Sequence, residues 1–99
     1  MFPARVMLSC SPEGRPSVLE RLSQEAATVP TRFDGNLLYV VSVDASNDHR
    51  VMIAEEWSDR SAFDAYQQSH HFTETMSVVQ PCLAAPPSSS YFEATRVGP

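Results

Sequence analysis

A carboxylate and the chain's only tryptophan lie two positions apart, at Glu55 and Trp57. Both close an apolar stretch, and side chains two apart on a β-strand point to the same face. If Trp57 lines a cleft, Glu55 lies beside it, and burial raises the pKa of a carboxylate that loses its hydration. Such a group acts as a general base toward a phenol near neutral pH. The alternative is a core Trp57 with Glu55 at the rim, paired with an arginine.

Two adjacent histidines, His70 and His71, form a second candidate for proton chemistry. A neutral imidazole accepts a proton near pH 7, which suits general-base catalysis. The alternative is a histidine that caps or packs a helix break. Adjacent residues on a helix point about 100° apart, so this pair does not bind one ion readily. With only His49 in addition, no metal site is expected.

Aromatic and hydroxyl side chains could hold a planar aromatic molecule in place. The tyrosine hydroxyls are candidates for orienting it, although each tyrosine could equally be a core aromatic with a satisfied hydroxyl. We predict a substrate-binding set of five residues: Tyr39, Tyr66, Phe63, Phe72 and His70.

These residues must be positioned by a strand followed by two helices. Residues 50–57 are too continuously apolar for a strand with one wet face, which predicts a strand covered on both faces. Ser58 or Asp59 then offers a helix-capping oxygen, and Ala62, Phe63 and Tyr66 form one apolar stripe. Ser69 predicts a fresh cap and a second short helix, which Pro81 ends.

The remaining elements complete an alternating pattern. Strands are predicted at residues 4–10, 37–45 and 91–97, with a hairpin loop at 46–48. A helix is predicted from Pro16 to Thr28, with Pro30 stopping it, and residues 82–90 are expected to be a Pro/Ser linker. The order β-α-β-β-α-β predicts an α+β, ferredoxin-like fold with a four-stranded antiparallel sheet, as a single domain over residues 1–99.

Both faces of this sheet are predicted to be too apolar to lie exposed to water. On the second strand, alternation separates Leu37, Tyr39, Val41 and Val43 from Leu38 and Val40, so both sides are apolar. Two helices cover only one face. We therefore expect a symmetric homodimer in which a second copy covers the other.

A sequence motif adds a family resemblance. The pattern E-x-W-x-D, then A-F, then S-x-H-F resembles the antibiotic biosynthesis monooxygenase family; it consists here of Glu55, Trp57, Asp59, Ala62, Phe63, Ser69, His71 and Phe72. The resemblance implies a dimeric α+β barrel. It also implies oxygen insertion into polycyclic phenols or quinols without metal or flavin, so no cofactor is expected.

The resemblance also ranks the candidates. Members of the family often have a histidine followed by an aromatic where His71 and Phe72 stand, so His71, with Glu55 and Trp57, is predicted to be catalytic. Tyr66 departs from the histidine that many relatives have there, and Ile53 stands where anthrone-oxidising relatives have asparagine. Haem-degrading relatives have asparagine in the first strand and histidine ten residues after the tryptophan. Ser9 and Gln67 occupy these places, so haem is not expected.

Composition restricts the partners. Seven basic and twelve acidic side chains give a formal net charge of -5 without a basic cluster, which disfavours nucleic acid and anionic membranes. No apolar run is long enough for a membrane span or a signal peptide, so a soluble, cytoplasmic protein is expected. Cys10 and Cys82 are isolated and are expected to be free thiols.

Three functions fit these observations. The first is a cofactor-independent monooxygenase that uses molecular oxygen on an electron-rich aromatic or polyketide-type intermediate. The second is a non-redox cyclase, isomerase or decarboxylase, and the third a non-catalytic dimer that binds a small molecule. The sequence has no G-x-G-x-x-G, P-loop or nucleophile-elbow motif, which argues against nucleotide cofactors and serine hydrolysis.

Overall fold

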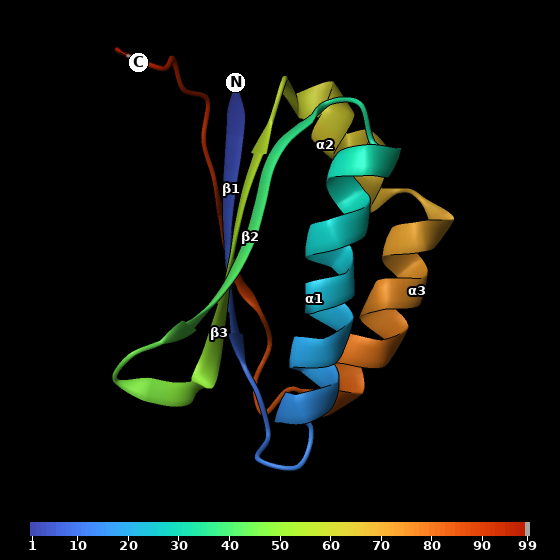
Figure 1. Cartoon of the computed structure of the whole chain (residues 1–99), viewed down its shortest axis with the longest axis vertical. Helices are drawn as coiled ribbons and strands as arrows, with labels where there is room; N and C mark the ends of the chain where they lie inside the picture. The colour runs from blue at the N-terminus through green and yellow to red at the C-terminus, as the bar shows by residue number, and fades with distance from the viewer. Residues whose placement is uncertain (99) are drawn as a thin grey trace.

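Four strands form one antiparallel sheet in the order β2-β3-β1-β4, and the helices pack against one of its faces (Figure 1). The computed structural model describes residues 1–98. Its elements are, in chain order, β1 (Phe2–Ser9), α1 (Arg15–Arg32), β2 (Asn36–Asp44), β3 (Asn47–Trp57), α2 (Arg60–Gln67), α3 (His70–Val79), the short 3₁₀ helix η1 (Gln80–Cys82) and β4 (Ser88–Tyr91). The predicted ferredoxin-like α+β fold is confirmed.

Strand β3 positions the candidate base. Val51, Ile53, Glu55 and Trp57 are buried, while the residues between them are half-buried. This alternation follows from the period of two in a strand, and it directs Glu55 and Trp57 toward the helices. The predicted pairing of the two central strands is confirmed, although the turn is tighter than expected because Asp44 already pairs with Asn47.

Helix α1 is longer than predicted. It buries Val18, Leu22, Glu25 and Val29, at spacings of four, three and four. The prediction that Pro30 stops the helix is wrong, because the helix continues to Arg32. Pro30 is exposed and lies in the last turn, so its ring forfeits one backbone hydrogen bond at a point where the helix is ending in any case.

Helices α2 and α3 are separate because each has its own cap. The carboxylate of Asp59 accepts a hydrogen bond from the backbone N–H of Ala62 at 2.8 Å, and the hydroxyl of Ser69 accepts one from Phe72 at 3.1 Å. Both predicted caps are confirmed. The chain therefore leaves one helix at Gln67 and starts a new one at His70, with a change of direction between them.

The last strand lies earlier in the chain than predicted. It spans Ser88–Tyr91, so it begins in the segment expected to be a linker and ends at the first residue of the predicted strand 91–97. Pairing with β1 starts directly after Pro87, which has no N–H to donate. Beyond Tyr91 the chain lies opposite Pro3, which also lacks an N–H. Single backbone hydrogen bonds, such as that from Phe92 to the carbonyl of Pro3 at 3.0 Å, then replace a regular ladder.

The face of the sheet away from the helices has an apolar centre, with charged and hydroxyl side chains such as Arg5, Glu56 and Ser42 around it. The register places Val40, Ala54 and Arg5 side by side across three strands. Two residues further along the same strands, Met52 pairs with Met7. Val40 is 44% exposed. We call this surface, formed by Met7, Leu38, Val40, Met52 and Ala54, the open face. Within residues 1–98, none of the helices combines the length and the apolar character needed to cross a membrane.

Candidate active site

A cavity of about 170 Å³ lies between the helix-facing side of the sheet and helices α2 and α3. Its walls are mainly aliphatic and aromatic. Four of the predicted site residues line it, namely Tyr39, Glu55, Tyr66 and Phe72. Gln67 and Thr75 add two polar side chains that the sequence had not suggested. An apolar cavity with a few converging polar groups is the usual form of a small-molecule site.

Glu55 is a buried carboxylate on the wall of this cavity. It is 4% exposed, and its Oε1 accepts a hydrogen bond from Nε1 of Trp57 at 3.0 Å. Burial raises the pKa of Glu55 to about 7, the indole donor lowers it in part, and the charge of Glu25 raises it further. Both protonation states are therefore populated near neutral pH. The alternative of a rim Glu55 paired with an arginine is not what the structure has: Trp57 is the partner of the carboxylate, and Arg5 donates to the backbone carbonyl of Glu55 at 3.3 Å.

Trp57 and Phe63 support the site from behind and do not line it. Trp57 is fully buried, with its ring stacked on that of Tyr66 at 5.1 Å between centroids and 6.1 Å from that of Phe63. Phe63 also packs against Phe2 at 5.2 Å. The two rings thus belong to an aromatic cluster that fixes Tyr66, while the polar edge of Trp57 holds Glu55.

Glu25 on α1 is the residue that sequence reasoning missed. It is 1% exposed, and its Oε2 accepts a hydrogen bond from the hydroxyl of Tyr66 at 2.9 Å. Its Oε1 lies 2.6 Å from Nε2 of His71 and 3.9 Å from Nε of Arg21. The sequence feature that could have indicated Glu25 is its spacing, because it lies three residues after Leu22 and four before Val29, on the buried face of the helix.

His71 contacts Glu25 and not the cavity. Its Nδ1 lies 3.3 Å from a guanidinium nitrogen of Arg32, which can only donate. Nδ1 is therefore the acceptor, and Nε2 carries the proton that is donated to Glu25. The geometry selects the neutral Nε2–H tautomer. His70 lies on the surface, where its Nε2 is 2.9 Å from Glu74 and its side chain is 84% exposed.

The two cavity tyrosines remain neutral. Burial is the main cause that raises the pKa of Tyr39 and of Tyr66, and the nearby charges of Glu25 and Glu55 raise both further. Each hydroxyl therefore keeps its proton at neutral pH. Tyr39 and Tyr66 therefore contribute neutral hydroxyl groups and do not supply a stable phenolate.

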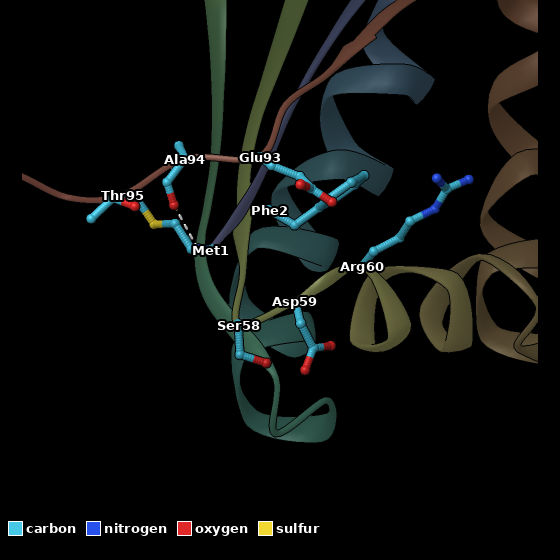
Figure 2. A pocket seen from close by; sticks show the side chains of 8 residues that line it. All are labelled: Met1, Phe2, Ser58, Asp59, Arg60, Glu93, Ala94 and Thr95. Atoms are coloured by element: carbon cyan, nitrogen blue, oxygen red, sulfur yellow. Dashed lines mark hydrogen bonds between the residues drawn. The ribbon is translucent and has the colours of Figure 1, made fainter.

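A larger hollow of about 390 Å³ lies at the edge of the sheet beside Met1 (Figure 2). The ammonium of Met1 donates to the carbonyl of Ala94 at 2.7 Å, shown there as a dashed line, and the Arg60 guanidinium points away from it. Asp59, Arg60 and Glu93 are exposed. Its charged side chains are ordinary surface groups, so the smaller cavity is the better candidate. Over residues 1–98, no three His, Cys, Asp or Glu side chains are grouped to hold a metal ion.

A sequence model of the family described as antibiotic biosynthesis monooxygenase matches residues 1–78. The chain belongs to this family. The matched range contains Glu25, Tyr39, Glu55, Tyr66 and His71, so the antibiotic biosynthesis monooxygenase domain carries the polar groups described above. A comparison with curated proteins finds no match.

Solved structures with the same architecture include three proteins assigned provisionally as antibiotic biosynthesis monooxygenases. The protein from Deinococcus radiodurans is 23% identical with a TM-score of 0.89, over 100% of this chain and 97% of its own. That from Nitrosomonas europaea is 17% identical with a TM-score of 0.88, over 97% and 100%. That from Caulobacter crescentus is 17% identical with a TM-score of 0.90, over 96% and 90%. At these identities the similarity shows the fold of the antibiotic biosynthesis monooxygenases.

Proposed function

We propose that this protein is a cofactor-independent monooxygenase that oxidises an electron-rich aromatic compound with molecular oxygen. The observation that supports it is Glu55, a carboxylate with a pKa of about 7 on the wall of an apolar cavity. A general base works best when its pKa lies near the working pH. Membership of the family supports monooxygenation, and the cavity supports a small, flat substrate.

The cavity also suggests the size of the substrate. Its volume of about 170 Å³ lies below the roughly 300–1,000 Å³ of sites for drug-sized ligands. We therefore propose a phenol with one or two fused rings. The aromatic faces of Phe72 and Tyr66 line the cavity and offer stacking surfaces for such a ring.

The proposed reaction starts when Glu55 removes the proton of a phenolic hydroxyl. The anion passes one electron to O₂, and the two radicals combine to form a carbon–oxygen bond para to the hydroxyl. Protonated Glu55 returns its proton to the resulting peroxide. Loss of the ring hydrogen and cleavage of the O–O bond release water and leave a quinone. Overall, a phenol and O₂ give a quinone and H₂O, so the substrate supplies all four electrons.

We also propose that the working unit is a symmetric dimer joined through the open face. Leu38, Val40 and Met52 would otherwise leave apolar side chains in water on a surface that no helix covers. Two sheets stacked face to face would bury them. Packing against the partner sheet would also make β3, the strand that carries Glu55, more rigid.

The experiment is incubation of the protein with 1,5-dihydroxynaphthalene and, as a three-ring comparison, 1,8-dihydroxyanthrone, in air and under argon. We expect the naphthalene to gain one oxygen atom and lose two hydrogens in air, with one oxygen-18 atom incorporated from labelled O₂. Glu55→Gln should lower the enzymatic rate by about 10²-fold or more. Glu56→Gln, one residue along on the opposite face, should retain it. A product isomeric with the substrate would indicate the non-redox alternative. Absence of any product from either compound would contradict the proposal.

A further inference from the structure

The contacts of Tyr66 form a chain in which the direction of every hydrogen bond is fixed. Arg32 donates to Nδ1 of His71 at 3.3 Å, and Nε2–H of His71 donates to Oε1 of Glu25 at 2.6 Å. The hydroxyl of Tyr66 donates to Oε2 of Glu25 at 2.9 Å. Since Arg32 can only donate, Nδ1 of His71 accepts and Nε2 carries the proton. Since a carboxylate can only accept, the hydroxyl of Tyr66 is the donor to Glu25.

These directions determine which hydrogen bonds Tyr66 can make with a molecule bound in the cavity. Its hydroxyl hydrogen is used by Glu25, so only the lone pairs of its oxygen remain for a bound molecule. Tyr66 lines the cavity together with Glu55, which accepts in its ionised form. Glu55 from the sheet and Tyr66 from α2 thus both act as acceptors on the cavity wall, beside the neutral hydroxyl of Tyr39, which can donate or accept. A ligand that satisfies both must carry two donors.

We propose that Glu25, acting through Tyr66, selects an aromatic substrate with two hydroxyl groups, one directed at Glu55 and the other at the Tyr66 oxygen. This inference rests on the proposed function for the nature of the ligand. Glu25 does not touch the substrate and is a positioning residue. As the hydroxyl over Tyr66 donates, its partial negative charge increases, which makes the substrate anion more electron-rich and so easier for O₂ to oxidise.

The surroundings of Glu25 keep it available as an acceptor. Arg21 on α1 lies 3.9 Å from Oε1 and also donates to the Thr75 hydroxyl on α3 at 3.0 Å. His71 donates from α3 and Tyr66 from α2. From the sheet, the charged form of Glu55 and the neutral hydroxyl of Tyr39 face the same interior. On the helical side, both oxygens of Glu25 therefore have hydrogen-bond donors within reach.

Replacing Glu25 by glutamine should reverse the direction of the hydrogen bond to Tyr66. His71 donates to one end of the side chain, so the amide oxygen of the introduced glutamine must occupy that end. The amide N–H₂ then faces Tyr66 and donates to its oxygen. The hydroxyl hydrogen of Tyr66 is released and can point into the cavity. Glu25→Gln thus converts Tyr66 from an acceptor into a donor with almost no change in shape.

The test measures ligand binding under argon, where no turnover occurs. Binding is monitored by the quenching of Trp57 fluorescence. The ligands are 1,5-dihydroxynaphthalene, its monomethyl ether 5-methoxy-1-naphthol, and 1-naphthol. We expect the wild type to bind the diol about tenfold more tightly than the ether, the size of one hydrogen bond. Tyr66→Phe should remove this preference, and Glu25→Gln should reverse it in favour of the ether. Glu20→Gln, an exposed change on the same helix, is the matched control.

A merely structural Glu25 would change the melting temperature but not the ratio of affinities. Equal ratios in the wild type, Glu25→Gln and Tyr66→Phe proteins would overturn the inference. The proposed function fails separately, if the diol binds with the expected preference but is not oxidised when air is admitted. Labelling of the histidines with nitrogen-15 adds a ligand-free readout: His71 should show the Nε2–H tautomer, and a protonated Nδ1 would remove the basis of the inference.

Discussion

The indole nitrogen of Trp57 donates a 3.0 Å hydrogen bond to the carboxylate of Glu55, and both side chains are buried on the same face of β3. Sequence alone left a choice between a tryptophan of the core and a tryptophan of the pocket. The structure combines them, because Trp57 packs in the core and its polar edge reaches the residue that lines the cavity. A core side chain therefore sets the chemistry of a cavity side chain.

Activity should follow the protonation of Glu55. Because only the carboxylate form accepts a proton, kcat/KM for 1,5-dihydroxynaphthalene should fall as the pH drops below about 7. Glu55→Gln should lower kcat/KM by about 10²- to 10⁴-fold and remove this acidic limb. Initial rates between acid and mildly alkaline pH provide the measurement. A Glu55→Gln protein with the wild-type rate and limb would show that Glu55 is not the base.

The free energy of unfolding should depend on the same carboxyl group, but in the opposite direction: it should fall with rising pH, whereas activity rises. The pKa of Glu55 is raised from 4.5 to about 7, so folding favours the protonated carboxyl. This contribution is complete below pH 4.5 and is lost as the pH rises through about 7. Glu55→Gln should therefore be more stable than the wild type above pH 7, by up to about 3 kcal/mol. Urea unfolding of both proteins across this range measures the difference, and parallel curves would contradict the expected raised pKa.

Trp57→Phe should separate packing from electrostatics. Loss of part of a fully buried ring should lower the free energy of unfolding by about 1–3 kcal/mol. Loss of the N–H donor should raise the pKa of Glu55 further, since that hydrogen bond lowers it at present. The acidic limb of kcat/KM should then move to higher pH. Phe63→Leu disturbs the same aromatic cluster without touching Glu55, so it should lower stability and leave the limb in place.

The open face should govern the oligomeric state. Val40→Glu places a charge where two sheets would meet, and a buried unpaired carboxylate is costly. We expect the molar mass measured by light scattering to fall from that of a dimer to that of one chain. Val78→Glu is the matched control, because Val78 is 39% exposed on the helical side and Val40 is 44% exposed. A wild-type protein that is already monomeric at micromolar concentration would contradict the dimer.

Local patterns predicted much of the fold and part of the site. Alternation along β3 correctly placed Glu55 and Trp57 on one face, and the capping residues Asp59 and Ser69 correctly placed the helix starts. These features depend only on neighbouring residues, which is why sequence suffices for them. The position of β4 was wrong because it depends on which backbone groups of β1 are free to pair, a long-range property.

Glu25 escaped prediction for a related reason. A carboxylate on an amphipathic helix is normally assigned to the wet face, and its buried position becomes reasonable only once its partners are known. Tyr66 is 41 residues away in sequence and His71 is 46. Spacing could have shown that Glu25 shares a row with Leu22 and Val29, but not that a hydroxyl and an imidazole would meet it there.

The interruption at Gln68 and Ser69 has a geometric effect on the two partners of Glu25. On one unbroken helix, Tyr66 and His71 would project about 140° apart and could not both reach a single carboxylate. The interruption re-aims the second helix so that one side chain approaches each oxygen. A one-residue insertion at this joint would change the point and direction from which the second helix starts, and so shift the imidazole relative to Tyr66. The spacing of this joint, and not only the residues on either side of it, is therefore part of the site.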